Sequence, residues 1–207
     1  MTFDITFDRK SDRETIDPIS YPVVEIFHSV QGEGAWAGVN AVFIRLGGCD
    51  VHCSFCDTKE SWNANLHPLQ SIDDIAQTVG RIKPAIAVIT GGEPLMHNLD
   101  PLTATIGLIT KKQIPIHLET SGAHPKSGNF DWVTLSPKQF KPPHASVYDR
   151  VQELKIVVSN PEDLQWAELQ STRVSLNALR YLQPEWGNPQ AQALTLDYIL
   201  AHPQWRM

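Results

Sequence analysis

From Tyr21 onward, two kinds of hydrophobic pattern alternate along the chain. Short apolar runs that end in glycine, proline or a polar cluster predict buried strands, and apolar residues at helical spacing fill several of the intervals. This alternation is typical of an α/β fold. Strands are predicted at residues 23–30, 41–46, 85–90, 114–119, 132–136, 153–158 and 174–182.

Four helices are predicted, at residues 71–82, 99–112, 162–170 and 189–201. The first has the clearest start, because Ser71 can cap it and two aspartates follow in its first turn. A complete eightfold β/α barrel takes about 250 residues. The 207-residue chain is therefore expected to form a partial, TIM-like β/α barrel of about six strands with few helices.

The polar composition of residues 1–20 predicts a flexible N-terminal leader, followed by a single domain over residues 21–207. A net charge of -6 with only 17 lysines and arginines argues against binding to nucleic acid or to an anionic membrane. No apolar run approaches the ~20 residues that span a bilayer. Small molecules or a second copy of the chain are the expected partners.

All three cysteines, Cys49, Cys53 and Cys56, fall within one CxxxCxxC segment. Thiolates are the usual ligands of iron–sulfur clusters, and three thiolates leave one iron of a four-iron cubane without a protein ligand. An odd number of cysteines argues against a self-contained disulfide framework. Since no secretory or membrane segment is recognised either, we expect a reducing, cytoplasmic location.

Other uses of these cysteines stay open at this point. A structural zinc site would need a fourth ligand, for which His52 lies inside the motif and His28 or His67 would have to come from elsewhere. Unbound buried thiols are a further alternative. A two-cluster ferredoxin is disfavoured, because its cysteines follow a CxxCxxC spacing and a fourth always follows.

Glycine-bearing or polar clusters directly follow five of the predicted strands. In parallel β/α folds the carboxyl ends of the strands form one rim, where active sites are built. Each cluster alone could be an ordinary turn, but five on one rim predict a site. The clusters are the cysteine segment after Gly47-Gly48 and residues 90–94, 119–122, 136–138 and 183–184.

The cysteine spacing, the aromatic Phe55 between the last two cysteines, and Gly-Gly-Glu-Pro at residues 91–94 resemble the radical S-adenosylmethionine (SAM) superfamily. This resemblance implies a 4Fe-4S cluster held by the three cysteines, with SAM bound at the free iron. Reduction then splits SAM into methionine and a 5'-deoxyadenosyl radical that takes hydrogen from the substrate. No side-chain acid or base is implied, because the cofactors perform the radical step.

Within that superfamily the chain resembles the 7-carboxy-7-deazaguanine synthases, from about Val23 to Trp205. The resemblance implies ring contraction of 6-carboxy-5,6,7,8-tetrahydropterin to 7-carboxy-7-deazaguanine with loss of ammonia, in queuosine biosynthesis. Magnesium and an electron donor such as flavodoxin or ferredoxin are implied as well. The segments that carry it are residues 29–34, 45–49, 56–58, 90–95, 119–122 and 136–138.

The resemblance also implies roles for individual residues. Cofactor contacts are expected from Phe55, Gly92, Glu93, Ser136, Pro137, Lys138, Gln183, Pro184, Glu185 and Trp186. Substrate contacts are expected from Val30, Gln31, Gly32, Glu33, Arg45, Thr90, Glu119 and His202. Thr58 is the implied magnesium ligand, although its hydroxyl could instead cap nearby backbone and Asp57 could be the ligand.

Two further expectations follow. Helix-poor flanks of a partial barrel leave apolar surface that a second copy could cover, which predicts a homodimer. The rival enzyme class is a small activating protein that installs a glycyl radical on a polypeptide. Residues 31–34, Arg45 and Thr58 favour a pocket for a small acid over a peptide groove.

Overall fold

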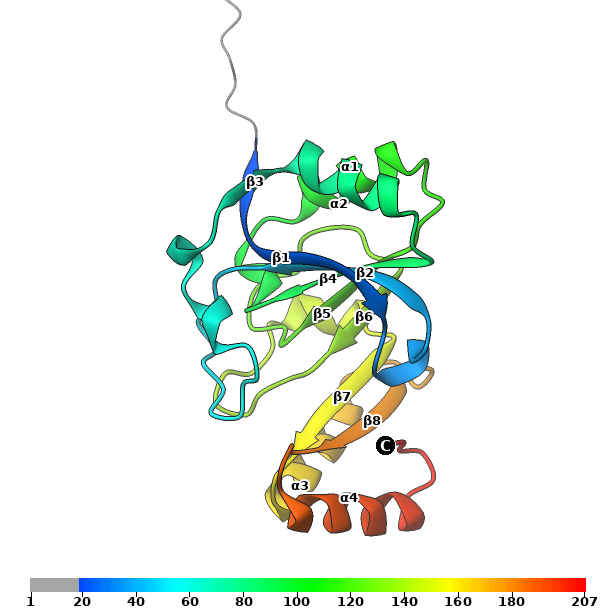
Figure 1. Ribbon diagram of the computed structural model, residues 1–207. Helices are drawn as coiled ribbons and strands as arrows, with labels where there is room; N and C mark the ends of the chain where they lie inside the picture. The colour runs from blue at the N-terminus through cyan, green and yellow to red at the C-terminus, as the bar shows by residue number, and fades with distance from the viewer. Residues whose placement is uncertain (1–18) are drawn as a thin grey trace, which may run out of the picture.

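The computed structural model describes residues 19–207 and has the expected α/β architecture (Figure 1). Its strands form one sheet in the order β3-β1-β2-β4-β5-β6-β7-β8. The strands are β1 (Ser20–Val30), β2 (Asn40–Leu46), β3 (Leu69–Ser71), β4 (Ile86–Gly91), β5 (Ile116–Thr120), β6 (Trp132–Leu135), β7 (Glu153–Val158) and β8 (Leu179–Pro184). The α-helices are α1 (Ile72–Ile82), α2 (Asp100–Ile109), α3 (Pro161–Ser171) and α4 (Pro189–Ala201).

Six of these strands run parallel to one another, from β2 through β4 to β8. The prediction of a partial barrel of about six strands is confirmed for this parallel core. Two strands extend it, because β1 pairs antiparallel with β2 and the short β3 pairs antiparallel with β1. Within the described chain β3 and β8 are the two ends of the sheet, so the barrel is open.

The two faces of the sheet have different roles. In β2, Val42, Ile44 and Leu46 belong to the main core together with buried residues of α1 and α2. The intervening residues Ala41 and Phe43 belong to a smaller apolar cluster on the other face. Since side chains alternate along a strand, Arg45 shares the face of Phe43. The polar rim residues thus point to the concave face, away from α1 and α2.

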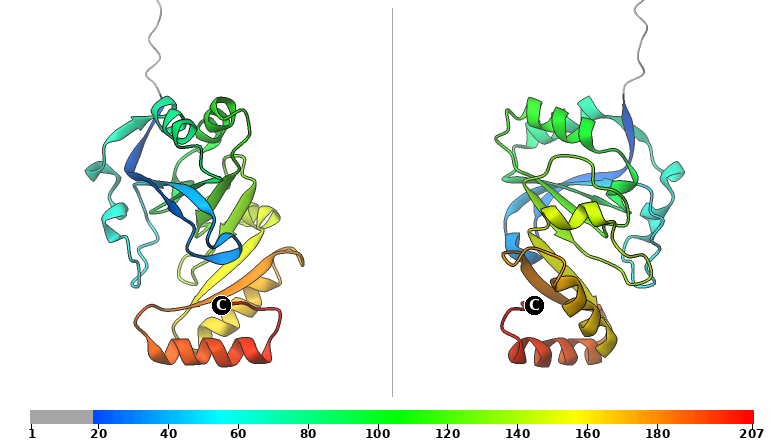
Figure 2. Two further views of the ribbon diagram at one scale, coloured as in Figure 1. Left: turned by 45° about the vertical axis from the view of Figure 1, so that its right-hand side comes forward. Right: turned by 180° about the vertical axis from the view of Figure 1, so that it is seen from behind.

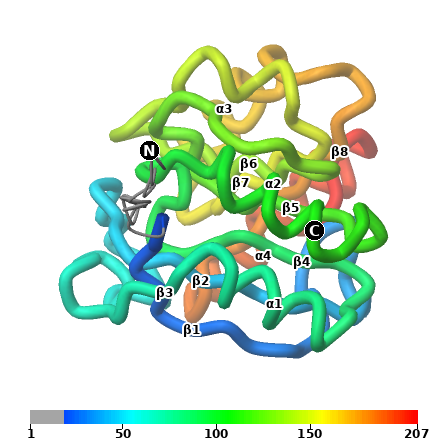
Figure 3. The backbone as a smooth tube through the Cα atoms, turned by 90° about the horizontal axis from the view of Figure 1, so that it is seen from above, coloured from blue at the N-terminus to red at the C-terminus, as the bar shows by residue number. Residues whose placement is uncertain are grey.

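The helices are few and lie at opposite ends of the molecule. Figures 1 and 2 show α3 and α4 beside β7 and β8, away from α1 and α2. Seen from above in Figure 3, α1 and α2 are nearest to the viewer and α4 lies behind them. Ser71 caps α1 by accepting a hydrogen bond from Asp74 N at 3.1 Å, as its position in the sequence predicts. Across residues 19–207, no helix has the length and apolar character needed to cross a membrane.

The structure moves several predicted boundaries and adds one strand. The last strand begins at Leu179 and not at residue 174, because residues 174–178 form turns in which Leu176 is exposed. Ser20, assigned to the leader, starts β1 and pairs with Ser71 of β3, a strand the pattern did not predict. The rest of the predicted leader, residues 1–18, lies outside the described residues.

Candidate active site

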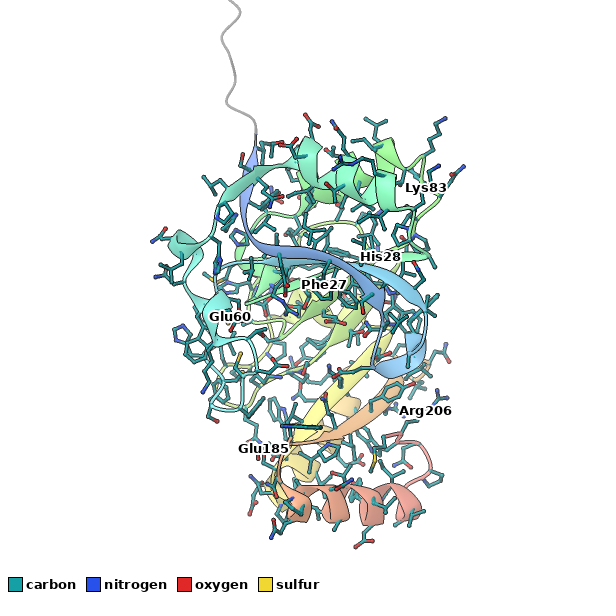
Figure 4. The ribbon with its side chains drawn as sticks, in the orientation of Figure 1. Phe27, His28, Glu60, Lys83, Glu185 and Arg206 are labelled. Carbon is teal, nitrogen blue, oxygen red and sulfur yellow. The ribbon has the colours of Figure 1, made fainter. Side chains whose placement is uncertain are left out.

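A cavity of about 450 Å³ opens at the carboxyl ends of the parallel strands. Its walls extend from Phe27 on β1 to Glu185 just after β8, and Figure 4 labels both. It therefore brings together residues far apart in the sequence, from the cysteine segment, the turn after β1 and the ends of the six parallel strands. Among the predicted residues that line it are Gln31, Gly32, Glu33, Arg45, Cys53, Phe55, Cys56, Thr58, Thr90, Glu119, Ser136, Lys138, Gln183, Pro184, Glu185 and Trp186.

The cysteine segment is held in place by backbone hydrogen bonds. Cys49 N donates to Trp62 O at 3.0 Å, and Cys56 N donates to Cys53 O at 3.1 Å. Asp50 anchors the middle of the segment through an ion pair with Lys141 at 2.5 Å and a contact with His124 at 2.9 Å. The loop is thus fixed to the loops that follow β5 and β6.

The donor set at this loop fits an iron–sulfur cubane. All three thiols are free; Cys49 is buried, whereas Cys53 and Cys56 face the cavity. Across residues 19–207, no three histidine, cysteine or carboxylate side chains converge on a point where one metal ion would sit. A cubane does not require such convergence, because each cysteine binds a different iron atom. The remote histidines are engaged elsewhere, His28 with Asn40 and His67 with Glu60 O.

Charge at the loop is balanced by a lysine. Burial raises the pKa of the Cys53 thiol, and the Lys138 ammonium acts in the opposite direction. Lys138 lies 5.6 Å from the centre of the Phe55 ring and donates to Ser136 Oγ at 2.8 Å. Burial lowers the pKa of Lys138 to about 8. Thiolate ligands would favour its charged form.

The Gly-Gly-Glu-Pro segment packs directly under the cysteine loop. A Cβ atom at Gly92 would lie 2.3 Å from Gly48 O and 2.7 Å from Cys49 Cβ, so only glycine fits there. The buried Glu93 carboxylate accepts hydrogen bonds from Leu95 N, Thr120 Oγ1, Ser121 N and Ser121 Oγ. Glu93 thereby joins the loops after β4 and β5, and its side chain is outside the cavity lining.

Several polar and charged side chains that line the cavity pair with one another or with a neighbour. Gln31 Nε2 donates to Glu119 Oε1 at 2.9 Å, and Gln183 Nε2 donates to Glu33 Oε1 at 3.1 Å. Arg45, with 19% of its side chain exposed, pairs through Nε with Glu25 at 2.9 Å. Since a guanidinium has five N–H donors, Arg45 keeps donors for a ligand.

The magnesium candidate, Thr58, lines the same cavity. Thr58 precedes the 3₁₀ helix η2 (Lys59–Trp62) without capping it through its side chain. Its hydroxyl instead donates to Asp57 Oδ1 at 3.1 Å, and both residues line the cavity. The two alternative oxygen ligands therefore stand side by side.

Two charged residues of β7 were missed by the sequence reasoning. Lys155 forms an ion pair with Glu33, and Glu153 accepts a hydrogen bond from Ala35 N at 2.9 Å. Burial alone would lower the pKa of Lys155, but the carboxylates of Glu33 and Glu119 outweigh it and raise that pKa. The signal was present in the sequence, because two charges at positions i and i+2 of an apolar strand share one face.

Several predicted residues lie away from the cavity. His202 ends α4, where its ring stacks on Tyr198 at 3.9 Å and its Nδ1 contacts Tyr198 O. Val30 is 57% exposed, and Pro137 lines a neighbouring cavity of about 590 Å³ beside α3. Gly92 lies beneath the cysteine loop, outside the cavity lining itself.

Residues 43–164 match the family model of the radical SAM superfamily, over more than half of the chain. The fold, the three cysteines at a strand end and this match define the class: the chain belongs to the radical SAM superfamily. Its cofactors are accordingly a 4Fe-4S cluster and SAM.

Individual relatives narrow the class further. The chain is 51% identical to a 7-carboxy-7-deazaguanine synthase from Synechocystis over 91% of its length and 89% of the relative's. It is 42% identical to the enzyme of that name from Flavobacterium psychrophilum, over 90% of this chain and 87% of the relative. The crystal structure of QueE from Escherichia coli matches with a TM-score of 0.78 at 32% sequence identity, and the match covers 90% of this chain and 92% of that one. The chain belongs to the 7-carboxy-7-deazaguanine synthase family.

Proposed function

We propose that this protein converts 6-carboxy-5,6,7,8-tetrahydropterin to 7-carboxy-7-deazaguanine with loss of ammonia, a step in queuosine biosynthesis. The observation that carries the proposal is the shared cavity, into which both Cys53 and Cys56 and the polar residues Gln31, Glu33 and Arg45 open. A small acidic substrate can therefore lie next to the cofactor. Membership in the synthase family supports the same reaction.

Cys49, Cys53 and Cys56 would hold the cluster as its three protein ligands. When bound, the cluster and SAM would together supply the one-electron chemistry that removes hydrogen from the substrate. Phe55, Gly92, Ser136, Lys138 and the residues at 183–186 would orient SAM beside the loop. Glu93 would meet SAM through its backbone carbonyl, which has a second lone pair, because its carboxylate is taken by four donors and its N–H by Gly48 O.

Arg45 and Thr58 would receive the carboxylated end of the substrate. Arg45 can bind a carboxylate through two parallel N–H donors. Magnesium keeps several waters and binds proteins through few ligands, so Thr58, with Asp57 beside it, would hold the ion jointly with the substrate carboxylate. The ion would act as a Lewis acid and a template.

The chain's partners are also part of the proposal. Leu196 and Leu200, four residues apart on α4, remain exposed, which supports a homodimer; light scattering that shows only monomer at micromolar concentration would reject it. Three free thiols and a cluster favour a reducing, cytoplasmic location. We expect a flavodoxin or ferredoxin as electron donor, and the net charge of -6 supports the expectation that the chain does not bind nucleic acid.

One assay tests the reaction. Protein reconstituted anaerobically with iron and sulfide is first checked by its ultraviolet–visible spectrum, which separates a cluster from zinc. It is then reduced with dithionite and supplied with SAM and the carboxytetrahydropterin, with and without magnesium, and the deazaguanine product is measured. An intact cluster without product would favour the glycyl-radical activating class instead.

A further inference from the structure

We propose that Lys155 donates a hydrogen bond to the ring carbonyl of the substrate. The neighbouring carboxylates of Glu33 and Glu119 would accept hydrogen bonds from the N–H groups of the substrate. This row of side chains would select a pyrimidinone ring over a diaminopyrimidine ring. The inference rests on the proposed function, because it takes the substrate to be a tetrahydropterin.

Lys155 occupies a central place among the cavities. It lines the main cavity, the adjoining cavity of about 250 Å³ towards Tyr181, and the small polar cavity that Glu153 and Glu119 also line. Only 18% of its side chain is exposed. The strand holds it firmly, since Leu154 and Ile156 on either side are buried in the core.

The ammonium of Lys155 has donors to spare. An ammonium group carries three N–H donors. Over residues 19–207, the hydrogen bond that Lys155 Nζ makes is to Glu33 Oε2. Burying a donor without a partner is costly, so a ligand acceptor at this wall would satisfy what the protein leaves open.

The neighbouring carboxylates have the complementary capacity. Each carboxylate oxygen has two lone pairs. Glu33 accepts from Lys155 and from Gln183, and Glu119 accepts from Gln31 through Oε1. Both therefore keep acceptor capacity, and both residues line the main cavity.

The substrate presents the matching edge. Along its pyrimidinone ring, a tetrahydropterin carries a carbonyl oxygen, then a ring N–H, then an exocyclic amine. The carbonyl oxygen of the substrate would thus accept from Lys155, and its ring N–H and exocyclic amine would donate to Glu119 and Glu33. An analogue with an amine in place of the carbonyl would place a donor against the Lys155 ammonium, and such a mismatch at a buried polar group is strongly disfavoured.

Binding measurements on the holoenzyme test this assignment. The protein with its oxidised cluster and SAM is titrated calorimetrically, without reductant and without oxygen, with 6-carboxytetrahydropterin and with its 2,4-diamino analogue. The variants are Lys155→Met and Lys155→Gln, and the matched control is Lys111→Met, which removes an exposed charge after α2.

We expect wild type and Lys111→Met to prefer the natural ligand by about 10- to 100-fold, the range of one charge-assisted hydrogen bond. In both Lys155 variants the preference should fall below about threefold, through loss of pterin affinity, while SAM affinity changes less than about twofold. A preference that survives in the variants would overturn the inference.

The outcome also separates the inference from the function on which it rests. Wild type that binds both ligands equally refutes the role of Lys155 alone, and this arm needs no folded variant. Wild type that binds neither pterin refutes the proposed function and the inference together.

Discussion

Replacing Gly92 with alanine tests the contact between the Gly-Gly-Glu-Pro segment and the cysteine loop. The added Cβ would meet Gly48 O at 2.3 Å and Cys49 Cβ at 2.7 Å. Neither atom lies at the end of a flexible side chain, so the backbone of one loop has to move. Movement would stretch the hydrogen bond from Glu93 N to Gly48 O, which is 2.8 Å long.

Three contributions determine how much Gly92→Ala changes the free energy of unfolding. Overpacking of this kind costs about 1–3 kcal/mol, and a weakened backbone hydrogen bond adds about 0.5–1.5 kcal/mol. Alanine returns about 0.4–1 kcal/mol by restricting the unfolded chain. We therefore expect Gly92→Ala to lower the free energy of unfolding by about 0.5–4 kcal/mol, with a middle value of about 2 kcal/mol.

Gly107→Ala is the matched control. Gly107 lies within α2, where the nearest atom to a new Cβ is Lys112 Cγ at 3.9 Å, an ordinary contact. Alanine within a helix is favoured over glycine by about 0.5–1 kcal/mol, so this variant should be slightly stabilised. The same substitution thus has opposite signs at the two positions.

Urea unfolding of the full chain under anaerobic, reducing conditions measures both variants. Iron and sulfide per chain after reconstitution provide a second readout, because displacement of Cys49 should reduce cluster incorporation in Gly92→Ala only. If Gly92→Ala matched Gly107→Ala in stability and bound a full cluster, the packing argument would be wrong.

Three further predictions follow from the site. Arg45→Ala should weaken pterin binding by about 2–5 kcal/mol, as expected for loss of a buried charge pair, and leave SAM affinity nearly unchanged; a large loss of SAM affinity would contradict its role. Thr58→Ala should raise the magnesium concentration needed for half-maximal activity, whereas Thr58→Ser should not; equal requirements would reject Thr58 as a ligand. Burial lowers the pKa of His117 to about 4, so only the unfolded chain gains this proton as pH falls from the unperturbed pKa of about 6.5. Stability should accordingly drop by ~2 kcal/mol between pH 8 and pH 5, and urea unfolding of His117→Gln should lack that component; identical pH profiles would refute it.

The sequence by itself determined most of what is local. Apolar runs bounded by glycine and proline gave the parallel strands, since burial on both faces demands such runs. The cysteines needed no fold to be recognised, because all three ligands lie in one short segment. Placement of the cluster, Thr90 and Glu119 at strand ends followed from the rule that parallel strands share one rim.

Only the tertiary structure decided which partners meet. Thr120 and Ser121, from the neighbouring strand β5 and the loop after it, donate hydrogen bonds to the Glu93 carboxylate. The side chain of Glu93, which the sequence suggested as a contact of SAM, therefore connects two loops. Lys155 reaches Glu33 across 122 positions of sequence. The physical reason is that the hydrophobic pattern of a strand specifies the face of the sheet on which each side chain lies. The order of the strands in the sheet decides which other side chains lie beside it on that face. The sequence of the C-terminal segment likewise did not decide whether His202 reaches the cavity. In the structure its ring stacks on Tyr198, one helical turn earlier.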